Sequence, residues 1–178
     1  VLAVAAVDIA AGEELCVCYL ERDSLPLLHF LLLPTERRQH LLQRWGFRCA
    51  CARCGSDTDT ARAFRCCAAA GPTCQGSMHA CLDAPGIGCC SVCRAQAPSG
   101  VARGLLEAEA ALCQAVEEQV GKAAPGAGGI RQLQATEVSG LLGRCGAAGL
   151  APSHWVVAWL RSLAVGGGGW RAQQAAAP

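Results

Sequence analysis

The residues of this chain best suited to chemistry are its cysteines. Ten of the 14 lie between Cys49 and Cys93. Cys49, Cys51 and Cys54 form a C-x-C-x2-C array, and a C-x2-C pair ends at Cys93. Such short spacings let neighbouring thiolates bind one metal ion, and four thiolates around zinc make a tetrahedral site. A disulfide framework would instead spread its cysteines along a short secreted chain. The spacing therefore predicts zinc binding.

The second cysteine-rich unit offers more thiols than one zinc ion needs. A set at the spacing of a zinc ribbon is Cys66, Cys74, Cys90 and Cys93. Cys67 and Cys89 are alternatives to their direct neighbours, and His79 or Cys81 could join. The competing interpretation is a poorly ordered loop with free thiols. Arginines next to the cysteines favour the thiolate forms that a metal requires, namely Arg48, Arg53, Arg65 and Arg94.

The elements expected before these cysteines are a short sheet and one helix. Residues 1–7 and 15–19 have the apolar patterns of strands, and the polar stretch 8–14 between them predicts a turn. A proline followed by Thr35 predicts a helix start with Thr35 as the N-cap, and this helix continues to about Arg44.

The elements expected after the cysteine array are a polar linker at 55–60 and, from Val101 onward, helices. Apolar residues recur at helical spacing in two segments, and Pro152 predicts the start of a third helix. Cys113 and Cys145 fall on these patterns, so we expect them to be small buried hydrophobic residues. Surface or capping positions are expected for the remaining histidines, His29, His40 and His154.

Three sequence runs together resemble one protein family. These are "GEELCVCY" (Gly12 to Tyr19), the helix start "PTERR" at Pro34, and "FRCACARC" ending at Cys54. In this order and at this spacing they resemble the C-terminal end of a SET domain with its post-SET cysteine segment. The likeness is to the SET-and-MYND type of protein-lysine methyltransferase. The later runs "CQGS" and "LAPSHWVVAWL" are similar to a second cysteine unit and to TPR-like helices of that family.

The resemblance implies a role for each matching residue. Cys49, Cys51 and Cys54 would bind the post-SET zinc, with a fourth ligand from a motif upstream of the given sequence. Cys16 or Cys18 is a local alternative, although strand cysteines more often pack against neighbours. By the same likeness, Tyr19 would be the catalytic residue at the methyl-transfer channel. The alternative for Tyr19 is a tyrosine packed at a sheet edge.

Two aromatic residues complete the site that the resemblance implies. Phe47 stands where the family places an aromatic ring against the adenine of S-adenosylmethionine. Trp45 stands where many relatives carry a tyrosine that lines the lysine channel. The tryptophan removes a hydroxyl group and adds bulk, which bears on the width of the channel, on the number of methyl groups added and on activity.

We therefore expect an α+β protein: the end of a SET β-fold, cysteine-rich zinc segments and C-terminal TPR-like helices. The boundaries would be 1–46 for the SET part, 47–58 for the post-SET zinc segment, 59–98 for the second zinc unit, 99–165 for the helices and 166–178 for a flexible tail. The implied activity is S-adenosylmethionine-dependent methylation of a lysine on a histone or another protein. The given segment alone should be inactive, because the glycine-rich cofactor segment of the family is not in it.

The alternative function is a non-enzymatic, zinc-dependent protein-interaction module. The net charge of +1 gives no reason to expect nucleic-acid binding. No apolar run reaches the roughly 20 residues of a membrane span, and the first residues lack the pattern of a secretory signal. We expect a monomer in the nucleus, the cytoplasm or both.

Overall fold

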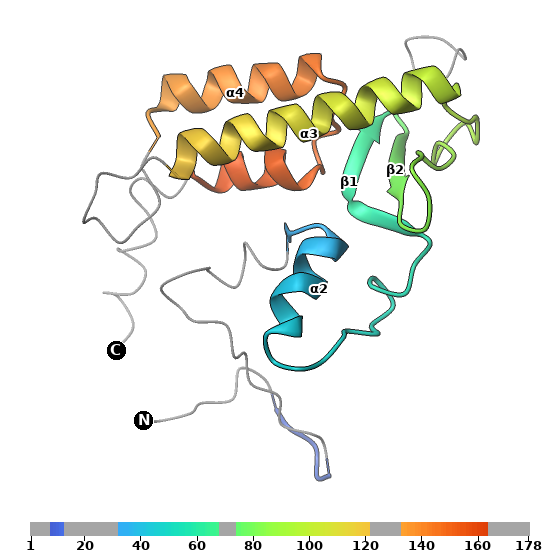
Figure 1. The fold of residues 1–178 in the computed structure, drawn as a ribbon, viewed down its shortest axis with the longest axis vertical. Helices are drawn as coiled ribbons and strands as arrows, with labels where there is room; N and C mark the ends of the chain where they lie inside the picture. Colours follow the sequence, from blue (N-terminus) through green and yellow to red (C-terminus); the bar gives the residue numbers. More distant parts are fainter. Residues whose placement is uncertain (1–7, 13–31, 68–73, 122–132, 164–178) are drawn as a thin grey trace.

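The protein has a mixed α+β fold in the computed structural model, which describes residues 8–12, 32–67, 74–121 and 133–163. The elements in chain order are α2 (Thr35–Gln43), β1 (Thr58–Arg65), β2 (Ser77–Cys81), α3 (Ser99–Gly121), α4 (Ala135–Ala147) and a helical stretch at 155–163 (Figure 1). Within the described ranges, no helix combines the length and apolarity needed to cross a membrane. The strands expected at 1–7 and 15–19, with Cys16, Cys18 and Tyr19, lie outside the described residues.

The second cysteine-rich unit contains a two-stranded antiparallel sheet. β1 pairs with β2 so that Phe64 lies opposite Met78, and both side chains are fully buried. The pairing shifts register between Asp59 and Ala63. The expected polar linker at 55–60 is wrong at its C-terminal end, because β1 already begins at Thr58. Two of the four buried positions of β1 are alanines, Ala61 and Ala63, so the strand lacks the pattern of large apolar residues that would have predicted it.

The helices pack on this sheet and complete one core. In Figure 1, α3 and α4 run side by side, with the 155–163 helix beneath them. The chain before that helix joins the edge of β1: the Ala151 N–H donates to the Ala63 carbonyl (2.9 Å), and the Arg65 N–H donates to the Gly149 carbonyl (2.8 Å). The largest fully buried apolar side chains of the described core are Phe64, Met78, Val116, Val138, Leu150, Val156 and Leu160. The predicted burial of Cys113 in α3 and Cys145 in α4 is confirmed.

A buried polar network crosses this core. His154 is fully buried, so the surface alternative expected for it is wrong. The capping alternative is confirmed, because His154 directly precedes the helix at 155–163 and its ring accepts the N–H of Val156 in the first turn. The Val156 N–H donates to His154 Nδ1 (3.3 Å), so the other ring nitrogen, Nε2, carries a proton and donates to Glu109 Oε1 (3.0 Å). Burial opposes ionisation of Glu109, but hydrogen bonds from Arg62 and His154 outweigh it and lower the pKa of this carboxyl. Arg62 of β1 and His154, which precedes the last helix, both hydrogen-bond to Glu109 of α3. The network therefore joins β1, α3 and the last helix.

The N-terminus of helix α2 is capped by a residue distant in the sequence and not by the residue at its own N-cap position. Thr35 is the first helical residue and not the N-cap, and Pro34 at the N-cap position has no side-chain hydrogen bond to offer. Instead, Asp59 Oδ2 accepts the Thr35 N–H (2.8 Å), while Asp59 Oδ1 accepts the Ala61 N–H (3.0 Å). A residue of β1 thus performs the capping that Thr35 was predicted to supply.

We predict that Asp59→Ala lowers the free energy of unfolding by about 1–3 kcal/mol, because two buried N–H groups lose their acceptor. Urea unfolding followed by circular dichroism measures this loss. Asp57→Ala is the matched control, because Asp57 is an exposed aspartate two residues away, and it should change stability by less than about 0.5 kcal/mol. Equal stability of the Asp59→Ala variant and the parent would contradict the capping role.

Candidate metal centres

Four cysteines of the second unit come together in one cluster. The sulfur atoms of Cys66, Cys74, Cys90 and Cys93 all lie within 4.8 Å of one another. Two sulfur pairs, Cys66 with Cys93 and Cys74 with Cys90, are 3.6 Å apart. Zinc–sulfur bonds of about 2.3 Å in a tetrahedron give sulfur–sulfur distances of about 3.8 Å. The cluster could therefore hold a metal ion, and its all-thiol donor set suits zinc.

The sheet positions two of these cysteines. Cys66 directly follows β1, Cys74 lies three residues before β2, and the Cys66 N–H donates to the Gly76 carbonyl (3.1 Å). The ladder that pairs the strands therefore also brings these two thiols together at one end of the sheet.

A tight turn supplies the other two cysteines. The Arg94 N–H donates to the Cys90 carbonyl (3.1 Å), and the Cys90 N–H donates to the Ala95 carbonyl (2.9 Å). Arg94 has a positive φ of 59°, which is uncommon for a residue with a side chain and marks a constrained turn. The Ser91 N–H donates to the Ser77 carbonyl (2.8 Å) and attaches this turn to β2.

Gly76 allows the turn to approach the sheet. A Cβ atom at this position would lie 2.3 Å from Cys90 Sγ and 3.1 Å from the Val92 backbone nitrogen. Both distances are shorter than ordinary van der Waals contacts. Only glycine therefore fits between β2 and the Cys90 thiol without displacing one of them.

The electrostatics of the turn favour a metal-binding thiolate. Backbone N–H groups of Val92 and Cys93 hydrogen-bond to the Cys90 sulfur and, with weaker help from the Cys93 and Cys66 thiols, lower the pKa of Cys90 to about 6. A thiolate is the form that binds metal, so the backbone prepares Cys90 for this role.

The alternative ligands of this unit lie outside the cluster. Cys67 Sγ points to Met78 Sδ (3.8 Å), and burial raises the pKa of the Cys67 thiol. Cys89 is exposed, and neither His79 nor Cys81 belongs to the group of converging sulfurs. The structure thus brings together the four residues chosen from the spacing and places their neighbours elsewhere.

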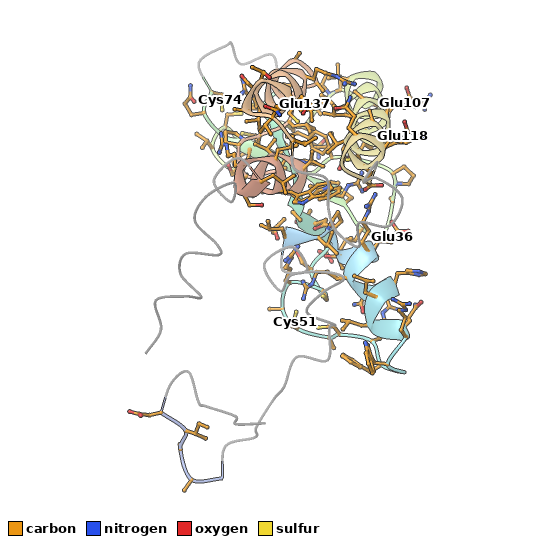
Figure 2. All side chains as sticks on the ribbon, turned by 90° about the vertical axis from the view of Figure 1, so that its left-hand side faces the viewer. Glu36, Cys51, Cys74, Glu107, Glu118 and Glu137 are labelled. Atoms are coloured by element: carbon orange, nitrogen blue, oxygen red, sulfur yellow. The ribbon has the colours of Figure 1, made fainter. Side chains whose placement is uncertain are left out.

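A second cluster contains the three sulfurs of Cys49, Cys51 and Cys54, which also lie within 4.8 Å of one another. Among the residues that the structure describes, no further histidine, cysteine or acidic side chain joins them. In Figure 2, Cys51 lies near the α2 end of the molecule and Cys74 beside the C-terminal helices, so the two clusters are separate.

The side chain of Gln39 fixes the start of this array. Its Nε2 donates to the Cys49 carbonyl (2.7 Å) and its Oε1 accepts the Cys49 N–H (2.9 Å). This two-bond contact joins α2 to the cysteines that follow it. The sequence gives no signal for Gln39, because a glutamine ten residues before a cysteine belongs to no recognised spacing pattern.

The thiols of this cluster differ in acidity. Hydrogen bonds from the Cys54 backbone and from the Cys49 and Cys54 thiols lower the pKa of Cys51 to about 6. Burial, together with the hydrogen bonds to Cys51 and Cys49, raises the pKa of Cys54 to about 11. A bound cation would therefore have to displace the proton of Cys54, whereas Cys51 is already prepared as a thiolate.

Two aromatic side chains directly precede this cluster and are exposed. Trp45 is 51% exposed and Phe47 is 50% exposed. Between them, Gly46 has a φ of +75°, which turns the chain sharply after α2. The array thus carries two large aromatic surfaces accessible to a ligand.

Comparison with known proteins found no matching family model and no matching curated protein.

We predict that Cys74→Ser removes one zinc equivalent from the purified chain and lowers its melting temperature, since three thiols bind zinc much more weakly than four. Cys67→Ser is the matched control: it removes a neighbouring thiol that points away from the cluster, so zinc content should stay unchanged. Inductively coupled plasma mass spectrometry measures the metal. Equal zinc content in both variants would exclude the four-cysteine site.

A further prediction concerns Gly76→Ala, which keeps all four thiols but places a methyl group against Cys90 Sγ. Zinc should be released to a chromophoric chelator at a lower chelator concentration than from the parent. Gly100→Ala, at a position with open space around it, is the control and should behave like the parent. Unchanged zinc affinity of Gly76→Ala would contradict the close contact between Gly76 and the Cys90 thiol.

Proposed function

We propose that the chain is the zinc-binding C-terminal part of a SET-and-MYND-type protein-lysine methyltransferase that uses S-adenosylmethionine. One observation supports this best: the sulfurs of Cys49, Cys51 and Cys54 converge, and the half-exposed Phe47 lies two residues before Cys49 in the sequence. The sequence likeness assigns this combination to a post-SET segment beside the cofactor.

Zinc at the three-cysteine cluster would fix the backbone that presents Phe47. Gln39 holds the first cysteine through two hydrogen bonds, so α2 and the metal would together define where the aromatic ring lies. In this proposal the half-exposed ring of Phe47 stacks on the adenine, and the fourth zinc ligand comes from an upstream motif. S-adenosylmethionine, when bound, supplies the methyl group on its sulfonium.

The remaining chemical requirement is a neutral lysine amine. At pH 7 a lysine of ordinary pKa is neutral in only about one molecule in two thousand, so a site must desolvate the amine and align it. We assign this orienting role to the Tyr19 hydroxyl, on the likeness of the "GEELCVCY" run to the family motif. The exposed Trp45 would narrow the lysine channel, because an indole replaces the phenol common at that place.

A second candidate is a non-enzymatic, zinc-dependent protein-interaction module. The fully buried core, from Phe64 to Leu160, lies within the second cysteine unit and the helices. Among the described residues, this part packs through side chains of the second cysteine unit and of the helices. The observation favours a module whose role is binding.

Calorimetry with S-adenosylmethionine separates the two proposals. On a chain extended upstream to include the glycine-rich segment of the family, we predict binding, and Phe47→Ala should weaken it by about tenfold or more through loss of ring stacking. Tyr19→Phe should keep cofactor binding and lower methyl transfer to a panel of histone and other peptides. Val92→Ala, at an exposed residue of the other cysteine unit, is the control. Absence of binding heat would exclude the methyltransferase and favour the interaction module. Undiminished methyl transfer by the Tyr19→Phe variant would refute the catalytic assignment of Tyr19.

A further inference from the structure

The four sulfurs of the cluster in the second cysteine unit form two close pairs. Cys66 Sγ lies 3.6 Å from Cys93 Sγ, and Cys74 Sγ lies 3.6 Å from Cys90 Sγ. The pairs join residues that are 27 and 16 positions apart in the sequence, and they share no cysteine. The arrangement that suits a metal ion is therefore also one in which two sulfur–sulfur bonds can form side by side.

Both pairs connect the sheet with the turn that follows it. Cys66 directly follows β1 and Cys74 lies three residues before β2, whereas Cys90 and Cys93 belong to the turn. A disulfide in each pair would therefore connect the same segments that a bound zinc ion connects. The alternative pairing, Cys66 with Cys74 and Cys90 with Cys93, would leave the turn without a covalent link to the sheet.

The exposure of the four cysteines indicates where a small oxidant reaches the cluster. Cys66, Cys74 and Cys93 are partly exposed, whereas Cys90 is fully buried. Oxidation of a cysteine requires thiolate character and access, and thiols that bind a metal are deprotonated. In the pair of Cys74 and Cys90, Cys74 is therefore the sulfur that a small peroxide reaches first, and Cys90 is the thiolate that reacts with the oxidised sulfur.

We propose that the four-cysteine cluster is a peroxide-sensitive zinc site, in which oxidation forms the disulfides Cys66–Cys93 and Cys74–Cys90 and releases the zinc ion. In each pair, one thiolate sulfur attacks an oxygen of hydrogen peroxide, the O–O bond breaks, and a sulfenic acid and a hydroxide form. The partner thiolate then attacks the sulfenic sulfur, forms the S–S bond and expels a second hydroxide. Two protons from solvent convert the hydroxides to water, so each pair loses two electrons to one peroxide molecule.

The chain remains cross-linked after the zinc ion is released. The thiolate is the form of cysteine that binds metal, so formation of the disulfides and loss of zinc belong to the same event. The two new bonds restrict the unfolded chain and thereby stabilise the sheet without the metal. The proposal rests on the four-cysteine site and not on the methyltransferase assignment, because it requires neither the cofactor nor Tyr19.

Disulfide mapping of the zinc-loaded chain after peroxide treatment tests the proposal. The chain is treated with hydrogen peroxide beside a chromophoric chelator, the remaining thiols are blocked, and the product is cleaved after Arg65, before Asp83 and after Arg94. Asp83 is the one acidic residue between the two arginines, so this cleavage separates the first two ligands from the last two. Zinc should be released, and the two fragments should stay joined by two disulfides, which fragmentation in the mass spectrometer assigns.

The double variant Cys67→Ser/Cys89→Ser is the matched control, because it removes the neighbouring thiols and keeps the four ligands. Cys67 points to Met78 and Cys89 is exposed, and neither belongs to the converging sulfurs. The variant should release zinc and form the same two disulfides as the parent. The oxidised parent should also melt at a higher temperature than the reduced, metal-free chain, because its disulfides restrict the unfolded state.

Each other outcome contradicts the proposal. Separate fragments that each carry their own disulfide would mean that the turn is not linked to the sheet. Disulfides to Cys67 or Cys89 would mean that the neighbouring thiols react in place of the paired ligands. Zinc that stays bound in peroxide, or thiols oxidised to sulfinic or sulfonic acid without disulfides, would exclude the peroxide-sensitive site. Zinc content is measured before treatment, and a chain that holds none would refute the metal site itself without bearing on cofactor binding.

Discussion

The structure depends on the convergence of four cysteine sulfurs at one end of a small sheet. Cys66, Cys74, Cys90 and Cys93 come from three chain segments, and their sulfurs lie within 4.8 Å of one another. Four ionised thiols at that separation repel each other unless a cation lies among them. The two strands and the turn carry few large apolar residues, and a structural zinc site can contribute about 10 kcal/mol or more to folding. We infer that a metal ion here determines whether the sheet forms.

The packing of the helices depends on the sheet. Phe64 and Met78 face each other across the two strands and supply the surface on which α3, α4 and the 155–163 helix bury their apolar faces. Two polar side chains of β1, at or beside the irregular pairing between Asp59 and Ala63, bind residues outside the sheet. Asp59 caps α2, and Arg62 binds Glu109 of α3 through two hydrogen bonds of 2.8 and 2.6 Å. One irregular strand therefore connects the three-cysteine segment, the four-cysteine cluster and the helical part.

The parts of the structure that depend on a local sequence pattern, such as cysteine spacing or apolar periodicity, could be predicted from the sequence. The four converging cysteines have the spacing of a metal site, and the helices α3 and α4 have periodic apolar faces. The two strands were not predicted, because Phe64 is the one large apolar side chain among the four buried positions of β1. Asp59, Gln39 and the contact of His154 with Glu109 were missed for a common reason: each of these hydrogen bonds joins residues at least ten positions apart, which no local spacing reveals.

Amide hydrogen exchange with and without metal shows whether the four-cysteine cluster determines the formation of the sheet. Removing the metal with a chelator should expose the amides of β1 and β2, and with them the Ala151 amide that binds the Ala63 carbonyl. We expect protection of β1, β2 and Ala151 to be lost together and to return when zinc is added back. Protection of β1, β2 and Ala151 that persists in the metal-free chain would contradict it.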